Sequence, residues 1–220
     1  MSLAKYRKKR DFQRSPEPRG RAKAGKASKR SLVYVVQKHR ASRLHYDFRL
    51  ELGGVLLSWA VPKGPSLDPS VKRLAMQVED HPVDYAAFEG VIPEGGYGAG
   101  TVMVWDNGTW SPESENPLQA LRQGDLKFSL YGRKLRGSWV LVRIRGFGSK
   151  QGKSWLLMKH QDRFASPKDI AAEKPRSVVS NRLLAEIARE EGGDPEAAAT
   201  GDPSPKAQNR PKAKRIAKKH

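Results

Sequence analysis

The chain has 220 residues and a formal net charge of +19, enough for one domain of ordinary size with charged extensions. It contains no cysteine, which excludes disulfides, thiolate metal sites and cysteine nucleophiles. No apolar run approaches the length of a membrane span, and the N-terminus lacks the apolar segment of a secretory signal. We therefore expect a cytoplasmic protein with no membrane partner.

The positive charge is concentrated at the two ends of the sequence. Residues 1–30 contain twelve Lys and Arg against two acids, and residues 206–220 contain seven and no acid. Residues 31–205 are close to neutral, with 23 basic and 21 acidic side chains. Basic arms typically meet a polyanion, most often nucleic acid, although a solvated or localising tail is the plainer interpretation. We expect a basic N-terminal arm over residues 1–30 and a disordered basic tail over residues 192–220.

Between these ends the sequence has the pattern of short β-strands. Residues 45–52 alternate without a break, with Tyr46, Phe48 and Leu50 on one face, and Asp106-Asn107-Gly108 is a tight-turn signal between two strands. The expected strands cover residues 32–38, 45–52, 55–61, 74–79, 101–105, 108–110, 126–131, 138–145 and 154–159. This spacing favours a compact antiparallel β-barrel, or a sandwich, over residues 31–165.

Helix signals come after the strands, in residues 166–191. A short helix is expected from Ser166-Pro167 to about Glu173. A longer one is expected from a cap at Ser180 or Asn181 to Glu191, where Gly192-Gly193 stops it. The predicted fold class is mainly β, with flanking short helices and disordered basic tails.

Two histidines and an aspartate are placed where they could bind a metal ion. His45 and Asp47 share one face of a predicted strand, and His39 lies just past the end of the preceding strand, where a loop could return it. Two imidazoles and a carboxylate suit a divalent ion such as Mn²⁺ or Zn²⁺ with open positions for substrate. Arg49 is next on the same face, and its planar guanidinium suits a phosphate. The alternative is a polar outer face of a half-buried sheet.

A second polar cluster follows the strand that ends near His81. Gln77, Glu79 and His81 alternate on one face, and Tyr85 follows four residues later. A histidine beside a bound phosphate could act as a general acid or stabilise charge, and a phenol could donate to a phosphate oxygen. His81 could instead simply cap a strand before Pro82.

Three other sequence features say less about function. The glycine-rich run over residues 93–100 lacks the Gly-Lys-Ser/Thr ending of a P-loop, so we interpret it as a bend rather than a phosphate cradle. No Lys-x-Asp-Gly motif occurs, so the chain lacks the nucleotidyl-transfer lysine of a DNA ligase. His160 near Asp162 has no third ligand and is expected to be structural.

Several blocks together resemble the 3′-phosphoesterase domain of bacterial DNA ligase D in its stand-alone form, over roughly residues 5–165. The blocks are Val36-Gln37-Lys38-His39, Ala41-Ser42-Arg43-Leu44-His45-Tyr46-Asp47-Phe48-Arg49-Leu50-Glu51, Trp59-Ala60-Val61-Pro62-Lys63-Gly64-Pro65, Val78-Glu79-Asp80-His81-Pro82 and Pro93-Glu94-Gly95-Gly96-Tyr97-Gly98-Ala99-Gly100-Thr101. Such ordered blocks are far more specific than any one motif.

The resemblance implies an activity on DNA primer–template 3′ ends during non-homologous end joining. The family releases a terminal ribonucleoside and then removes the 3′-phosphate that is left, typically with Mn²⁺, although Zn²⁺ or Co²⁺ would suit the same ligands. It implies a monomer in the bacterial cytoplasm, associated with the nucleoid, with a DNA ligase and Ku as candidate partners.

The resemblance also implies roles for individual residues. The metal ligands would be His39, His45 and Asp47. Phosphate contacts would come from Arg49, His81, Lys63 and Arg73. Further catalytic positions would be Tyr85, Gln37 and Glu79, together with Arg10, Asp11 and Glu17 of the arm, which would then fold back over the site.

Two other functions share these features. A non-catalytic adaptor could bind DNA ends through its tails and recruit a ligase or Ku, but it would not need His, Asp and Arg on one strand face. A metal-dependent phosphodiesterase that acts on RNA could use the same site.

Overall fold

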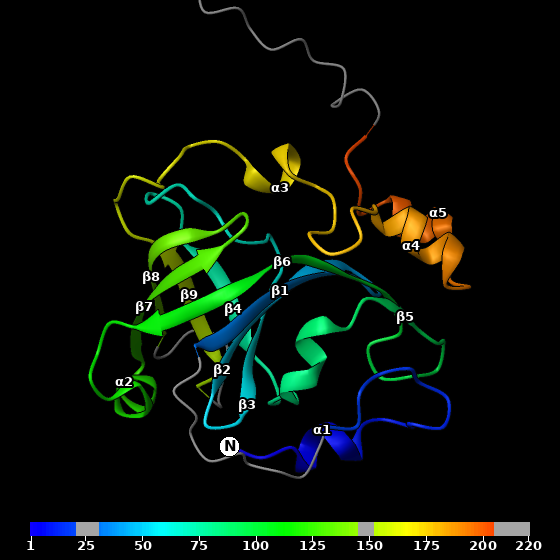
Figure 1. Cartoon of the computed structure of the whole chain (residues 1–220), viewed down its shortest axis with the longest axis horizontal. Helices are drawn as coiled ribbons and strands as arrows, with labels where there is room; N and C mark the ends of the chain where they lie inside the picture. The colour runs from blue at the N-terminus through cyan, green and yellow to red at the C-terminus, as the bar shows by residue number, and fades with distance from the viewer. Residues whose placement is uncertain (21–30, 145–151, 205–220) are drawn as a thin grey trace, which may run out of the picture.

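Nine β-strands of the described residues form one antiparallel sheet that closes into a barrel. The computed structural model describes residues 1–20, 31–144 and 152–204. The strand order is β1-β2-β3-β4-β9-β8-β7-β6-β5, and β1 also pairs with β6, so that β5 lies outside the closed eight-strand barrel (Figure 1). The predicted fold class, an antiparallel β-barrel with short helices, is confirmed. No helix of these residues is long and apolar enough to cross a membrane.

The bounds of the strands follow the sequence pattern closely. The strands are β1 (Leu32–Arg40), β2 (Leu44–Leu52), β3 (Val55–Val61), β4 (Arg73–Gln77), β5 (Gly90–Ile92), β6 (Gly100–Pro112), β7 (Asp125–Gly132), β8 (Arg136–Arg143) and β9 (Ser154–Lys159). The helical elements are α1 (Ala4–Lys8), the 3₁₀ helix η1 (Val83–Ala87), α2 (Pro117–Gln123), α3 (Ile170–Glu173), α4 (Leu184–Glu190) and α5 (Pro195–Ala199).

The first strand is longer than predicted, which corrects the position of His39. We expected His39 in a loop after the strand, but it lies within β1, directly opposite His45 of β2. The strand continues because it is paired on both sides, with β2 and with β6, where His39 lies opposite Val102. The two imidazoles are therefore neighbours across a ladder.

The predicted turn at Asp106-Asn107-Gly108 is wrong, because β6 runs through it without a break. The buried Asp106 carboxylate accepts hydrogen bonds from the Tyr34 hydroxyl (2.6 Å) and from the backbone N–H groups of Lys134 (2.9 Å) and Leu135 (2.8 Å). A shift in the β1–β6 register between Val36 and Gln37 takes up the irregularity. Three directed donors outweigh a local turn preference.

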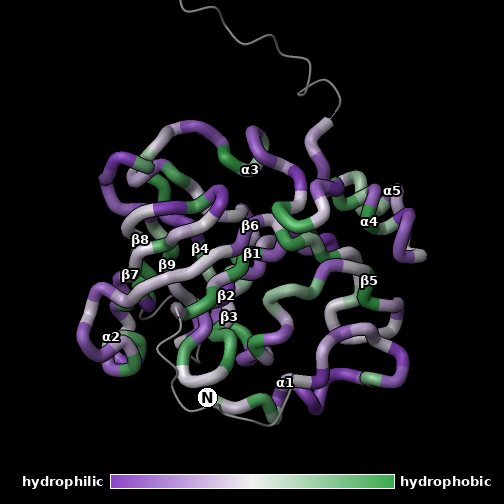
Figure 2. Tube along the Cα trace, in the orientation of Figure 1, coloured by the Kyte–Doolittle hydropathy of each residue, from purple (hydrophilic) through white to green (hydrophobic). Residues whose placement is uncertain are grey.

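The barrel interior is filled by apolar side chains from every closing strand. Tyr46, Phe48 and Leu50 of β2 point into this core, and four tryptophans, Trp59, Trp105, Trp139 and Trp155, are completely buried. The other face of β2 therefore points outward. Figure 2 shows the hydrophobic and hydrophilic positions distributed over this frame. Apolar side chains occupy the interior, and the polar side chains of β2 lie on the outer surface of the barrel.

A second, smaller apolar cluster covers part of that outer surface. It combines Tyr6 of α1 with Val35, Leu56, Tyr85 and Phe88. The Tyr6 hydroxyl donates to the carbonyl of Pro18 (2.6 Å), which ties the two ends of the described arm together. Residues 1–20 thus pack against the barrel, which their basic composition does not predict, and residues 21–30 lie outside the described residues.

The late helices are shorter than predicted. The helix expected from Ser180 or Asn181 begins instead at Leu184, because Glu186 accepts the N–H of Leu183 (2.8 Å) and Asp202 accepts the N–H of Leu184 (3.1 Å). The helix expected from Ser166-Pro167 is reduced to α3, whose N-cap is Asp169.

The disorder expected from residue 192 onward does not extend to α5. Asp194 caps this helix, Pro195 starts it, and its Ala198 is buried against α4. The basic residues 206–220 of the predicted tail lie outside the described residues.

Asp106→Ala should destabilise the fold strongly. The change leaves the Tyr34 hydroxyl and two backbone N–H groups buried without an acceptor, which should cost about 3 kcal/mol or more in the free energy of unfolding. Urea denaturation followed by tryptophan fluorescence measures it. Asp125→Ala, at the exposed start of β7, is the matched control and should change stability by less than about 0.5 kcal/mol. Equal effects of the two changes would contradict the role given to Asp106.

Candidate metal and phosphate site

A polar pocket of about 190 Å³ lies on the outer face of β1 and β2. The strands supply His39, His45, Asp47 and Arg49, and the segment after β4 supplies Glu79, His81 and Tyr85. Arg10 of the N-terminal arm and Tyr97 of the glycine-rich bend close the pocket from the other side. Segments that are far apart in the sequence therefore meet over one strand face.

His39, His45 and Asp47 bring their ligand atoms within 4.8 Å of one another. Nδ1 of His39 is 3.6 Å from Oδ2 of Asp47, and Nε2 of His45 is 3.7 Å from the same oxygen. The ladder pairing of His39 with His45 and the two-residue step from His45 to Asp47 produce this convergence. The predicted polar face is thus an outer face of the sheet, but one that is largely buried beneath other segments.

The hydrogen bonds of the two imidazoles indicate which nitrogen atoms are free to bind a cation. Nε2 of His39 lies 2.9 Å from the carbonyl of Gly98, and Nδ1 of His45 lies 3.0 Å from the carbonyl of Arg43. A carbonyl only accepts, so these nitrogens carry the protons. The opposite nitrogens face Asp47. An N–H donated to a carbonyl is the usual arrangement behind a metal-bound histidine.

The charge states agree with this donor set. Burial, with help from His39 and Arg49, lowers the pKa of His45 against the opposing effect of Asp47. Burial alone would raise the pKa of Asp47, but Arg49 and the two imidazoles outweigh it and hold that pKa well below its usual range. The His45 imidazole with its lowered pKa, the His39 imidazole and one carboxylate therefore face a common point, and they fit a divalent ion such as Mn²⁺.

Arg49 lies beside His39, His45 and Asp47, and hydrogen bonds fix the orientation of its guanidinium group. Its Nη2 is 3.2 Å from Asp47 Oδ2, its Nε donates to Oε1 of Gln37 (2.8 Å), and its Nη1 donates to Oγ of Ser58 (2.8 Å). The Gln37 amide is itself fixed, since it donates to the carbonyls of Tyr85 (3.1 Å) and Phe88 (2.8 Å). Gln37 therefore positions Arg49 and does not line the pocket.

His81 is held by its backbone and by two charged neighbours. An isolated β-bridge pairs His81 with Leu56. Its Nε2 lies 3.1 Å from Nη2 of Arg10, and its Nδ1 lies 2.8 Å from Nη1 of Arg49 and 2.9 Å from the Glu79 carbonyl. Each guanidinium can only donate, so a donor faces both ring nitrogens. Burial, and then the positive charges of Arg49 and Arg10, lower the pKa of His81 well below its ordinary value. This imidazole is neutral at physiological pH.

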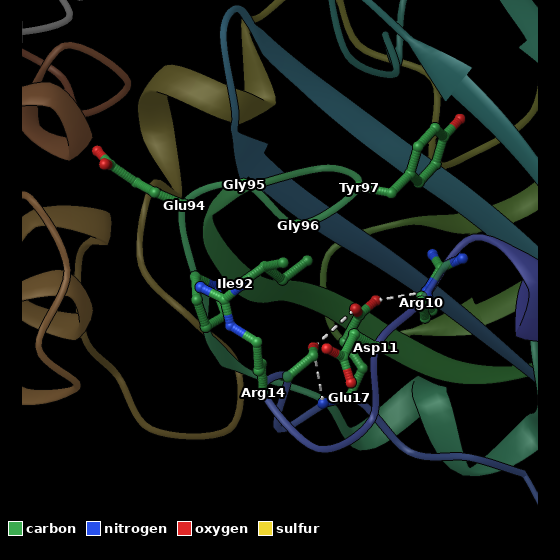
Figure 3. Close-up of a pocket in the computed structure, with 11 residues that line it drawn as sticks. Arg10, Asp11, Arg14, Glu17, Ile92, Glu94, Gly95, Gly96 and Tyr97 are labelled. Atoms are coloured by element: carbon green, nitrogen blue, oxygen red, sulfur yellow. Dashed lines mark hydrogen bonds and ion pairs between the residues drawn. The ribbon is translucent and has the colours of Figure 1, made fainter.

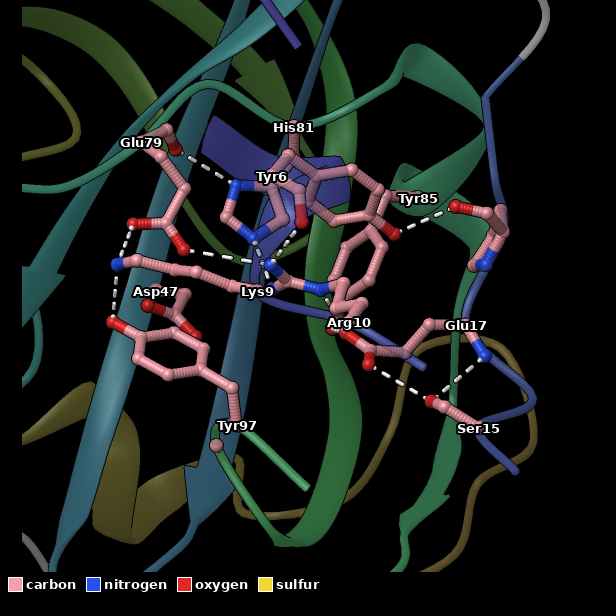
Figure 4. Close-up of polar contacts among 12 residues, drawn as sticks. Tyr6, Lys9, Arg10, Ser15, Glu17, Asp47, Glu79, His81, Tyr85 and Tyr97 are labelled. Atoms are coloured by element: carbon pink, nitrogen blue, oxygen red, sulfur yellow. Dashed lines mark hydrogen bonds and ion pairs between the residues drawn. The ribbon is translucent and has the colours of Figure 1, made fainter. Parts of the chain in front are cut away.

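The arm completes the site through Arg10 and Glu17 (Figure 4). Nε of Arg10 donates to Oε1 of Glu17 (2.8 Å), and the Arg10 guanidinium lies 3.9 Å from the ring centroid of Tyr6. The Tyr85 hydroxyl donates to the same Glu17 oxygen (2.9 Å). Burial and the nearby Glu17 raise the pKa of Tyr85 well above its ordinary value, so the phenol remains protonated. Buried ionic contacts therefore attach the arm to the site.

Five expected site residues do not line this pocket, namely Gln37 and Glu17, whose contacts are given above, and Asp11, Lys63 and Arg73. Lys63 is exposed beyond the end of β3, and Arg73 is the first residue of β4. Asp11 is exposed and lines a neighbouring hollow (Figure 3). Its Oδ1 accepts the N–H of Gln13 (3.0 Å). Gln77 also leaves the predicted cluster, because its Oε1 accepts from Trp155 (3.1 Å). The strand β4 ends there, which breaks the alternation.

The sequence reasoning missed Tyr6, Lys9, Ser58 and Tyr97. Lys9 donates to Glu79 (3.0 Å) and to the Tyr97 hydroxyl (2.9 Å), so it bridges the arm and the bend. An aromatic residue such as Tyr6 in an otherwise basic arm is itself a sequence signal for a surface anchor, whereas nothing in its local pattern singles out Ser58. His160 bonds to Ser138 (2.7 Å) away from the pocket, consistent with its expected structural role.

Comparison with known proteins adds a family to this geometry. Residues 37–143 match the family described as the DNA ligase D 3′-phosphoesterase domain. Over 185 residues the chain is 56% identical to the multifunctional non-homologous end joining protein LigD of Pseudomonas aeruginosa, a match that covers 83% of this chain and 22% of the relative. It is 44% identical over 146 residues to the corresponding Mycobacterium tuberculosis protein (66% and 18%) and 39% identical over 179 residues to that of Mycolicibacterium smegmatis (77% and 22%).

The pocket residues from His39 to Gly98 all lie within the matched segment. The chain belongs to the DNA ligase D 3′-phosphoesterase domain family. It spans about a fifth of the length of the curated relatives that it matches.

His39→Ala should abolish tight binding of Mn²⁺. Changes in groups that merely orient a ligand cost about 10- to 100-fold in metal affinity, and loss of a ligand should cost at least as much. Titration of free Mn²⁺ by electron paramagnetic resonance measures the affinity without reference to activity. His160→Ala is the matched control and should bind Mn²⁺ like the wild type. An unchanged affinity in the His39 variant would contradict the ligand assignment.

Proposed function

We propose that this chain is a metal-dependent phosphoesterase that heals 3′ ends of DNA in non-homologous end joining. It would remove a 3′-phosphate, and it would release a 3′-terminal ribonucleoside from a primer strand. The observation that carries the proposal is the convergence of three electron-rich ligands with two buried guanidinium groups, those of Arg49 and Arg10, in one pocket. Two imidazoles and a carboxylate are ligands that bind a divalent cation, and paired guanidinium groups are suited to bind a phosphate.

The metal ion and the two arginines of the pocket would have distinct chemical roles in this reaction. A bound divalent ion, Mn²⁺ or an alternative such as Zn²⁺ or Co²⁺, would supply Lewis-acid stabilisation and lower the pKa of water. Arg49 is held by Gln37 and Ser58 so that its Nη2 faces the Asp47 side of the pocket, where a non-bridging phosphate oxygen could accept from it. Arg10 is placed to offset charge that develops as the phosphoester bond breaks.

His81 and Tyr85 would act mainly as neutral polar groups in this mechanism. The lowered pKa of the His81 imidazole and the raised pKa of the Tyr85 hydroxyl keep both uncharged at neutral pH. A neutral imidazole can accept a proton or a hydrogen bond in the reaction. Tyr85 would hold Glu17, and through it Arg10, in position.

The printed names of the relatives support the DNA context of the proposal, since they describe multifunctional non-homologous end joining proteins. DNA 3′ ends are therefore the proposed substrates, and a DNA ligase and Ku are the proposed partners. An adaptor without catalytic activity fits less well. Burying Asp47, Arg49, Arg10 and Glu17 in one place is costly, and no observation indicates what an adaptor would gain from it.

Arg49→Lys should lower the rate of phosphate release while leaving the metal site intact. Lysine keeps the positive charge beside Asp47 but lacks the planar fork, so kcat/KM for a 3′-phosphate primer–template should fall about 10- to 100-fold. An end-labelled primer–template assay with and without Mn²⁺ measures the rate. Mn²⁺ affinity should stay close to that of the wild type.

The same assay contains its own controls. Arg189→Lys, at an exposed position in α4, should behave like the wild type. A primer with one 3′-ribonucleotide, compared with an all-RNA strand, distinguishes a DNA end-healing enzyme from a general RNA phosphodiesterase. Absence of Mn²⁺-dependent cleavage of every primer by the wild-type protein would overturn the proposed function.

A further inference from the structure

Tyr97 has an unusual position for a large aromatic residue. Among the described residues, only six large hydrophobic side chains are exposed, and Tyr97, which is 49% exposed, is the one that lines the metal pocket. The other exposed aromatic, Tyr131, lies on β7 and lines a separate hollow. Figure 4 shows the Tyr97 ring at the edge of the site, near Asp47 and Lys9. An apolar ring left in water beside a reaction centre suggests a ligand.

The ring is fixed in place from both sides of the pocket. Its hydroxyl accepts from Nζ of Lys9 (2.9 Å), and that ammonium lies 4.1 Å from the ring centroid. The next residue along the chain, Gly98, supplies the carbonyl that orients His39. The ring thus has a defined distance from the proposed metal ligands.

The surroundings of the ring are open on the side of the glycine-rich bend. A Cβ atom added at Gly95 would meet nothing within 4 Å, and Gly95 and Gly96 are both exposed. The adjacent helix α1 presents the exposed cations Lys5, Arg7 and Lys8. An aromatic face with nearby positive charge is the combination that single-stranded nucleic acid recognises, by base stacking and phosphate contact.

We propose that Tyr97 is the platform on which the nucleobase of the 3′-terminal nucleotide stacks. The proposal rests on the proposed function. If the terminal phosphate is bound beside Arg49 and the metal ligands, the nucleoside that carries it must lie at the mouth of the pocket, where Tyr97 is the exposed aromatic. Stacking is tolerant of sequence, because every base has a flat face. An enzyme that heals broken ends of any sequence needs that tolerance.

A competing role for Tyr97 is that of a latch for the arm. The contacts with Lys9 would serve it equally well, since Lys9 also binds Glu79. The two roles differ in what they require. A latch needs the hydroxyl and Lys9 but no base on the substrate, whereas a platform needs the ring and the base.

The first test compares two primers with each variant. Both primers end in a 3′-phosphate, and in one of them the terminal nucleotide is abasic. Tyr97→Ala should raise KM about tenfold or more on the normal primer, as expected for loss of one stacking contact, and should leave KM on the abasic primer unchanged. Tyr97→Phe should resemble the wild type on both. Tyr131→Ala is the matched control and should change neither.

The latch predicts a different pattern in the same assay. Lys9→Met and Tyr97→Phe would then reproduce the loss seen with Tyr97→Ala, and the abasic primer would be affected as strongly as the normal one. Equal effects of Tyr97→Ala on the two primers would overturn the stacking proposal.

The second test does not depend on activity, and so it separates the failure of this inference from the failure of the proposed function. A primer whose 3′-terminal base is fluorescent 2-aminopurine is titrated with protein in the absence of metal. Stacking on Tyr97 should quench its fluorescence with the wild type and Tyr97→Phe but not with Tyr97→Ala. Quenching that persists in Tyr97→Ala, or that is absent with the wild type, would overturn the proposal even if phosphate release is normal.

Discussion

The contact between Asp47 and Arg49 is the interaction on which the rest of the site depends. Both side chains point away from the filled barrel core, yet both are nearly inaccessible to solvent. Opposite charges removed from water need partners on every side. Gln37 and Ser58 meet the guanidinium, and the two imidazoles meet the carboxylate. Other segments cover this polar face of the sheet, and these contacts fix the orientation of its charged groups.

The cover comes from the N-terminal arm, and the arm stays in place for the same electrostatic reason. Arg10 and Glu17 are buried and bonded to each other. Each also reaches a group of the barrel side, Arg10 through His81 and Glu17 through Tyr85. Removing one member would leave a charge without its partner, which costs more than the pair itself contributes. The apolar contact of Tyr6 with His81 and Tyr85 adds a second, non-ionic attachment. The arm and the barrel therefore form the site together.

The sequence predicted the fold well because alternation records which face of each strand is buried. The boundaries of β3 and β9 agree with the prediction, and the division of β2 into an apolar and a polar face agrees as well. The prediction was wrong where contacts with residues distant in the sequence override the local turn or strand preference. The Asp106 turn is replaced by a continuous strand because three donors from other segments bind that carboxylate. Pairing on both sides of β1 likewise extends it through His39.

For the site, local pattern alone could place His45, Asp47 and Arg49 together, since they share one strand. It could not show that Arg10 and Glu17 join them, because their positions depend on a fold that returns the arm across the barrel; that expectation came from resemblance to a family. The same resemblance suggested Lys63 and Arg73, which lie outside the pocket.

The short segment Tyr97-Gly98 contacts two parts of the site, the His39 imidazole of β1 and Lys9 of the N-terminal arm. Its carbonyl fixes the tautomer of His39, and its ring is bound by Lys9 of the arm. A Cβ atom at Gly98 would lie 3.6 Å from Cε1 of His39, and the positive φ of 79° at that position favours glycine. Close approach of the backbone to the imidazole is thus built into the glycine-rich bend. The bend thus contributes both the carbonyl that orients the proposed metal ligand His39 and the Tyr97 ring that lines the pocket.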